Sequence, residues 1–170
     1  LTPDGVQPWL NTLSAPVQYP QVPLSINYQK YGMGEQELAW YDAQLKVESR
    51  NQSAVAWVQD FLGLVVRKIT LPDIPVGHLK FLISDGSRHQ KLSIVSGDLD
   101  FGLVVDQPDN WGEAIELIIN SRLECSSEKI QEVFTTCLQQ ATSADVKVTM
   151  VAEDSFHPGF PDPTYRFPRI

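Results

Sequence analysis

The chain has 170 residues, a length typical of one domain, and its 21 acidic and 13 basic residues give a formal net charge of −8. Hydrophobic residues make up 42% and charged residues 20%, which are globular proportions and argue against disorder or a membrane protein. Because Lys and Arg supply nucleic-acid affinity by neutralising phosphates, the acidic charge disfavours DNA, RNA and anionic membranes as partners.

Residues 1–34 are rich in proline and glycine, and we expect them to form an extended, linker-like arm. Apolar and aromatic residues such as Trp9 and Tyr31 interrupt its polarity, so the arm either docks onto the body or packs against a partner domain. Since the chain begins at Leu1 rather than Met, we expect an excised domain, a processed product or a chain whose start has been removed.

Residues 37–49 end in a two-residue alternation, which predicts a half-buried strand, although the first residues of this segment also favour a helix. Apolar residues at three- and four-residue spacing then predict a helix from Val55 to Ile69. We expect Ser53 to cap this helix and Pro72 to end it.

Two strands, 76–84 and 91–95, are predicted on either side of Asp85-Gly86, a tight-turn signal because glycine reaches positive φ without a clash. Residues 103–105 form either a short strand or a loop. The branched apolar residues of 114–123 then predict another buried strand.

Ser126 or Ser127 is expected to cap a second helix, with Glu128 near its positive end and an apolar stripe reaching Ala141. Residues 146–152 alternate cleanly and supply the last strand. The segment that follows is again rich in proline.

The resulting order is strand, helix, strand, strand, strand, helix, strand, and two right-handed crossovers would place both helices together. We therefore predict an α+β ferredoxin-like sandwich, in which a mainly antiparallel sheet of four to five strands carries two helices on one face. The predicted organisation is an arm over 1–34, a core domain over 35–153, and a tail over 154–170 packed on the core.

The sequence carries none of the common catalytic motifs. It has neither GxxxxGK[ST] nor GxGxxG, the glycine patterns that cradle phosphates at a helix start. Its histidines lack the HExxH spacing of a zinc enzyme, and Cys125 and Cys137 are expected to be ordinary reduced thiols. We expect no catalytic residue, no cofactor and no metal site.

The segment 156–167 combines four aromatic residues with three prolines, which makes it stiff and adhesive. Either it completes the core or it binds a partner. Trp9, His157, Tyr165 and Arg166 are the candidate partner-binding residues, being aromatic or basic types that are common at interfaces.

Three segments together resemble the C-terminal region of CobW-like metal-chaperone GTPases, in a divergent subgroup. They are Gly77-His78-Leu79-Lys80, Asn120-Ser121-Arg122-Leu123-Glu124-Cys125 and the segment from Phe156 to Arg166. Over residues 35–167 the resemblance implies an accessory domain that packs against a nucleotide-binding partner, with the arm as its hinge. This sequence lacks the P-loop and the CxCC-type metal motif of the family's GTPase half, so those activities are not carried over to any residue.

We therefore expect a non-catalytic accessory or interaction domain located in the cytoplasm. Its expected partner is a nucleotide-binding domain or GTPase, in cis or in trans, and a homodimer through an unpaired sheet edge is a further expectation. Two alternatives stay open. One is a small-ligand binding module on the sheet, and the other is an enzyme whose site the sequence does not reveal, with His78, Asp98 and Arg122 as candidates.

Overall fold

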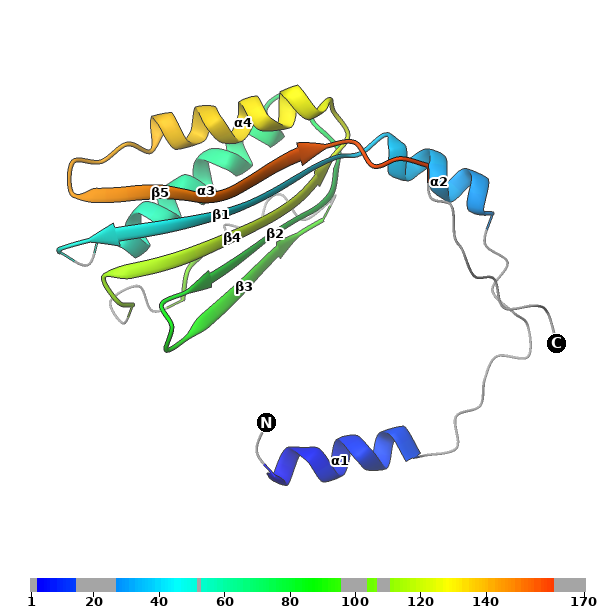
Figure 1. The fold of residues 1–170 in the computed structure, drawn as a ribbon, viewed down its shortest axis with the longest axis horizontal. Coiled ribbons are helices and arrows are strands. Elements are labelled where there is room, and N and C mark those ends of the chain that lie inside the picture. Colours follow the sequence, from blue (N-terminus) through cyan, green and yellow to red (C-terminus); the bar gives the residue numbers. More distant parts are fainter. Residues whose placement is uncertain (1–2, 15–26, 52, 96–103, 107–110, 161–170) are drawn as a thin grey trace.

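The computed structural model describes residues 3–14, 27–51, 53–95, 104–106 and 111–160 (Figure 1). The helices are α1 (Pro3–Ser14), α2 (Tyr28–Gln36), α3 (Ala54–Thr70) and α4 (Ser127–Gln140). The strands are β1 (Ala39–Ser49), β2 (Val76–Ser84), β3 (His89–Ile94), β4 (Ala114–Leu123) and β5 (Val146–Phe156). The predicted alternation of strands and helices in the body is confirmed.

The five strands form one sheet in the order β3-β2-β4-β1-β5, and all neighbouring pairs are antiparallel. The run β5-β1-β4-β2 has the order of a ferredoxin-like sandwich, with β3 added beyond β2. Both α3 and α4 lie over the same face of the sheet, as Figure 1 shows. The predicted fold class, including the extra strand, is confirmed.

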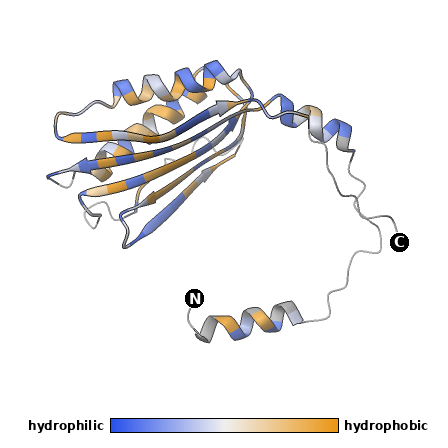
Figure 2. Ribbon diagram, viewed as in Figure 1, coloured by the Kyte–Doolittle hydropathy of each residue, from blue (hydrophilic) through white to orange (hydrophobic). Residues whose placement is uncertain are grey.

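The core lies between this face and the two helices. Alternate residues of each central strand are buried there, and Figure 2 shows the matching alternation of hydrophobic and hydrophilic residues. Tyr41 stacks on Phe134 at 4.1 Å between ring centroids, which joins β1 to α4. Fully burying a large apolar side chain stabilises a fold by about 1.5–3 kcal/mol, so this layer dominates stability.

The two core helices begin in different ways. In α4 the Ser126 side chain accepts a hydrogen bond from the Lys129 backbone N–H at 3.1 Å, so Ser126 is the cap. In α3 the prediction of Ser53 as a capping side chain is wrong, because its hydroxyl makes no capping bond. The Ser49 hydroxyl, which the end of β1 delivers, instead accepts from the Ala54 N–H at 3.1 Å.

The turn between β2 and β3 forms as predicted, with Gly86 at a φ of +86°. The Asp85 carboxylate accepts hydrogen bonds from the backbone N–H groups of Ser87, Arg88 and Gly112. Burial alone would raise the pKa of Asp85, but these bonds outweigh it and hold the pKa well below its ordinary value. The turn is therefore tied to the start of β4.

The prediction of an extended arm is wrong for the parts of it that the structure describes, since they form α1 and α2. Proline is tolerated at the first position of a helix, where α1 has Pro3, and α1 continues through Pro8. The Asn27 side chain caps α2 by accepting from the Lys30 N–H at 3.0 Å. Local capping thus outweighs the glycine and proline content on which the prediction rested.

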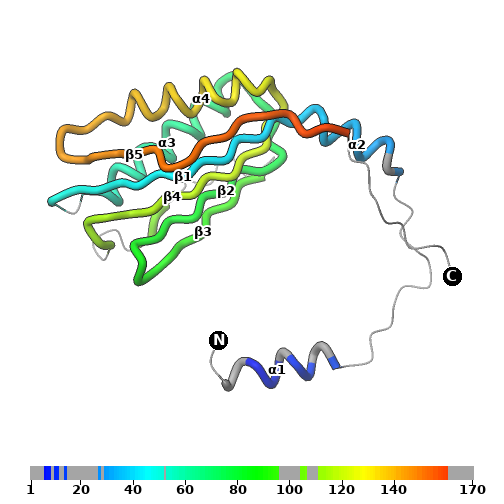
Figure 3. Tube along the Cα trace, in the orientation of Figure 1, coloured from blue at the N-terminus to red at the C-terminus, as the bar shows by residue number. Residues whose placement is uncertain are grey.

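The segment just after β5 lies beside α2 at one end of the sheet (Figure 3). The His157 Nδ1 lies 3.0 Å from the Gln36 carbonyl oxygen, and a Cβ on Gly32 would lie 2.6 Å from the Phe160 ring. Gly32 is therefore needed for close approach. Because β5 continues to Phe156, the first residues of the predicted tail belong to the sheet.

Candidate functional site: the open face of the sheet

The face of the sheet opposite α3 and α4 is called the open face here. Cross-strand register arranges its side chains in rows that run across the strands. The first row contains Phe156, Trp40, Arg122 and His78. The second row contains Asp154, Asp42, Asn120 and Lys80. These rows bring together residues from four strands, at the end of the sheet where α2 lies.

Trp40 is the centre of the first row. The Arg122 guanidinium lies 3.6 Å from the centroid of its ring, and the Phe156 ring lies 5.5 Å away at a tilt of 43°. Arg122 also makes an ion pair with Glu35 of α2, with an N···O distance of 3.5 Å. The Trp40 Nε1 and Arg122 Nε atoms are buried and have no hydrogen-bond partner within the described residues.

A chain of hydrogen bonds links the two rows. The Asn120 amide donates to the Asp42 carboxylate, and the Asn120 oxygen lies 2.6 Å from His78 Nε2. Since the Asn120 oxygen can only accept, His78 Nε2 carries the proton. Burial lowers the pKa of His78, and Lys80 and Arg122 act in the same direction, against the hydrogen bond to Asn120 and the Asp42 carboxylate, which raise it.

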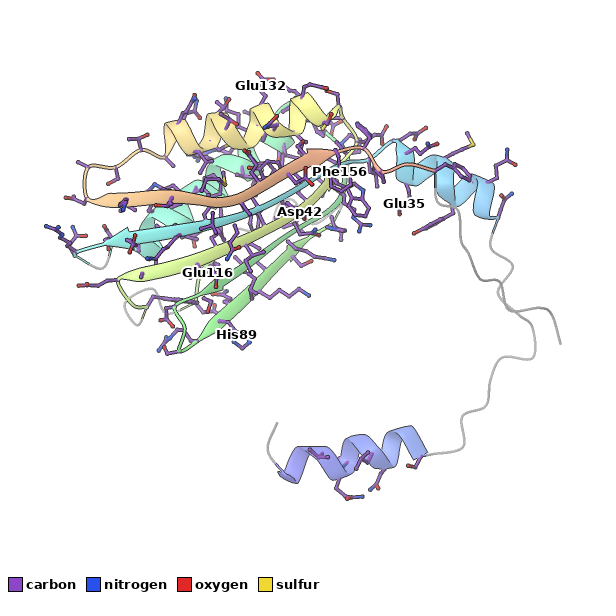
Figure 4. The ribbon with its side chains drawn as sticks, in the orientation of Figure 1. Glu35, Asp42, His89, Glu116, Glu132 and Phe156 are labelled. Carbon is purple, nitrogen blue, oxygen red and sulfur yellow. The ribbon has the colours of Figure 1, made fainter. Side chains whose placement is uncertain are left out.

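A shallow groove of about 360 Å³ runs over β1 beside these rows. Its lining residues on the open face are Asp42, Gln44, Ile118, Asn120, Ala152 and Asp154. Ile118 is 39% exposed at its floor, and Asp42 lies directly opposite Asp154. Two like charges facing each other across a strand pair destabilise a sheet, so this arrangement costs the fold stability. Figure 4 shows Asp42 and Glu116 on the sheet and Glu132 on α4, across the molecule.

A larger hollow of about 670 Å³ lies at the opposite end, where β1 leaves the sheet and β5 enters it. Its lining residues include Glu48, Arg50, Asp145 and Lys147, which are polar residues of strand ends and turns. No aromatic side chain is among its lining residues within the described parts of the chain. The open face therefore offers the more specific arrangement of side chains.

Of the four residues predicted to bind a partner, the structure describes His157 and Trp9. His157 contacts α2, as described above, and Trp9 lies in α1, which Figure 1 shows apart from the sheet. Tyr165 and Arg166 lie outside the described residues. Of the candidates for a hidden enzyme site, His78 and Arg122 are cross-strand neighbours, whereas Asp98 also lies outside the described residues.

Sequence reasoning missed Trp40, Asp42 and Asn120 as site residues. The one signal in the sequence was that they alternate with the buried residues along β1 and β4 and therefore lie on the other face of the sheet. Which of these positions meet depends on register, and the sequence did not specify the register.

In the parts of the chain that the structure covers, no group of three or more His, Cys, Asp and Glu residues could hold a metal ion. Both cysteines are free, and burial raises the pKa of the Cys137 thiol to about 11. None of the described helices is long and apolar enough to cross a membrane.

No family model, curated protein or solved structure matches the chain. The resemblance to the C-terminal region of CobW-like GTPases therefore stays a prediction.

Proposed function

We propose that this chain is a non-catalytic interaction domain that binds a partner protein through the open face. The observation that carries the proposal is Trp40, held between Arg122 and Phe156 on a sheet face that α3 and α4 leave uncovered. Tryptophan and arginine are the residue types that most often supply binding energy at protein interfaces. Here both are partly buried and lie in contact on the neighbouring strands β1 and β4.

The rows are held in place before any partner arrives. Trp40, Asp42, Asn120 and Arg122 lie on two hydrogen-bonded central strands, and each contacts another member of the rows. Fixing a side chain on binding costs about 0.5–1.5 kcal/mol, and residues that are already fixed avoid that cost. This rigidity supports a role in recognition.

Around the second row, charges of opposite sign lie on different strands of the open face. Asp42 and Asp154 lie on β1 and β5, whereas Lys80 and Lys91 lie on β2 and β3; Lys147 lies on β5 farther from the rows. A complementary partner would place basic groups over Asp42 and Asp154 and acidic groups over Lys80 and Lys91. The overall charge of −8 also disfavours a polyanionic partner.

The shape of the groove favours a protein over a small molecule. Small-molecule sites usually enclose most of their ligand, whereas this groove is open along one side. An extended segment or a flat surface could contact the groove and the aromatic row together. A GTPase or another nucleotide-binding domain, and a cytoplasmic location, remain parts of this proposal; the free thiols agree with a reducing compartment.

Photo-crosslinking in cells of the source organism tests this proposal. A photo-crosslinking residue replaces either Ile118 on the open face or Glu132 on the outer side of α4. We expect a discrete adduct from position 118 and none from position 132. Adding Lys80→Glu should remove the adduct because it reverses a charge in the second row. Equal crosslinking from both positions, or an adduct that Lys80→Glu leaves unchanged, would contradict the proposal.

A small-ligand module on the same face is the second candidate function, because a volume of about 360 Å³ suits a small molecule. A thermal-shift screen of amines, carboxylic acids and nucleotides distinguishes this candidate from a protein-binding domain. A midpoint increase that Asp42→Asn removes would favour this candidate over a protein partner, whereas a uniformly flat screen would count against it.

A further inference from the structure

The two edges of the sheet differ in how they are covered. At the short edge strand β3, the Gln90 side chain donates to the Val104 carbonyl oxygen and accepts from the Asp106 N–H, so the 104–106 segment lies against it. The other edge strand, β5, has 11 residues and pairs with β1 alone among the described strands. Its outer side therefore presents backbone donors and acceptors to another strand.

A β-bulge in β5 changes which residues share a face. Gln44 pairs with Ala152 and Leu45 pairs with Met150, which leaves Val151 as an extra residue without a partner in β1. Lys147 and Asp154 are an odd number of positions apart, and in a regular strand they would point to opposite faces. Because of the extra residue, both lie on the open face.

We propose that β5 pairs antiparallel with β5 of a second copy of this chain. The two-fold axis passes between Met150 and Val151, and Lys147 of each copy lies opposite Asp154 of the other. This register keeps the open faces of both copies on the same side of one continuous sheet. It goes beyond the proposed partner site, because the dimer leaves the rows around Trp40 uncovered.

Charge and apolar exposure select this register among the alternatives. A one-residue slip would place open-face residues opposite core-face residues. A two-residue slip would place Lys147 opposite Ala152 or Phe156, which loses the ion pair. In the proposed register the apolar side chains of Met150 and Val151, which are 36% and 56% exposed, meet at the axis.

A lysine and a bulge ordinarily protect a sheet edge from pairing with another chain. In β5 the same two features also suit self-pairing, because the bulge puts Lys147 and Asp154 on one face, where each can lie opposite the other residue of a second copy. The symmetric dimer contains this ion pair twice. Reversing one charge of the pair replaces two attractions with two repulsions.

Sedimentation of the full chain over a range of concentrations tests the dimer. We expect a monomer–dimer equilibrium that Lys147→Glu or Asp154→Lys shifts toward monomer on the order of tenfold. The double variant, in which the two charges are exchanged, should restore the equilibrium. Lys129→Glu on α4 is the matched control and should leave it unchanged.

A chain that stays monomeric at every concentration, or a dimer that responds equally to Lys129→Glu and Lys147→Glu, would overturn the proposal. Since Lys147 also lies beside Glu48, its reversal could affect folding, and hydrogen exchange of the unmodified chain supplies an independent measurement. Amides of β5 should gain protection as concentration rises, and amides of β3 should not. Concentration-independent exchange in β5 would also overturn the proposal.

Discussion

The two faces of this sheet are built from the same strands and yet have different chemistry. On the helix-covered face, Tyr41, Phe81 and Leu117 are fully buried among apolar neighbours. On the open face, one position along the chain, Trp40 and Asp42 contact charged and polar residues of neighbouring strands. A two-residue period therefore lets one strand supply apolar side chains to the core and place charged and aromatic side chains on the opposite face.

The largest difference between the faces should appear when side chains are truncated in β2. Phe81→Ala, on the helix-covered face, should lower the free energy of unfolding by about 3–5 kcal/mol because it leaves a cavity in a closely packed core. Leu82 is the next residue in the chain and lies on the open face, so Leu82→Ala should lower the free energy of unfolding by about 1 kcal/mol or less. Urea denaturation measures both, and equal losses would contradict the division of roles between the faces.

A smaller effect should follow from Tyr41, whose phenol is buried in the core. The Tyr41 hydroxyl donates to the Glu153 carboxylate at 2.9 Å, so Tyr41→Phe should cost about 0.5–1.5 kcal/mol at neutral pH. Burial and the Glu153 carboxylate raise the pKa of Tyr41, whereas an unfolded tyrosine ionises near pH 10. The folded chain then holds more protons than the unfolded chain, so this contribution falls as the pH rises above about 10.

Urea denaturation of the wild type and of Tyr41→Phe between pH 7 and pH 11 checks this expectation. The stability difference between the two proteins should shrink at the alkaline end. Tyr31→Phe is the matched control, since that ring is 54% exposed on α2, and it should differ little from the wild type throughout. A difference that grows with pH would show that the sign is wrong.

The smallest expected effect is a gain in stability on the open face. Asp154→Asn removes the repulsion between Asp154 and Asp42, so it should raise the free energy of unfolding by about 0.2–0.5 kcal/mol. Asp145→Asn, in an exposed turn, is the control. Urea denaturation at low protein concentration measures this gain, because β5 is then not paired with a second copy. A loss of stability would mean that Asp154 supports the fold rather than binding.

The sequence determined the elements of the body because their signals are local. The apolar content of 76–84 and the branched apolar residues of 114–123 predicted the bounds of β2 and β4, and the apolar spacing of α3 and α4 predicted both helices. The prediction failed at α1 and α2. It gave the glycine and proline content more weight than the capping side chain of Asn27 and the tolerance of proline at a helix start.

The tertiary structure alone decided which side chains meet. Trp40 and Arg122 are far apart in the chain, and they touch because β1 and β4 pair in one particular register. The contact between Gly32 and Phe160 and the face shared by Lys147 and Asp154 likewise depend on packing and on one bulge. Local sequence specifies that a residue points toward or away from the core, whereas its neighbour is set by the pairing of strands distant in sequence.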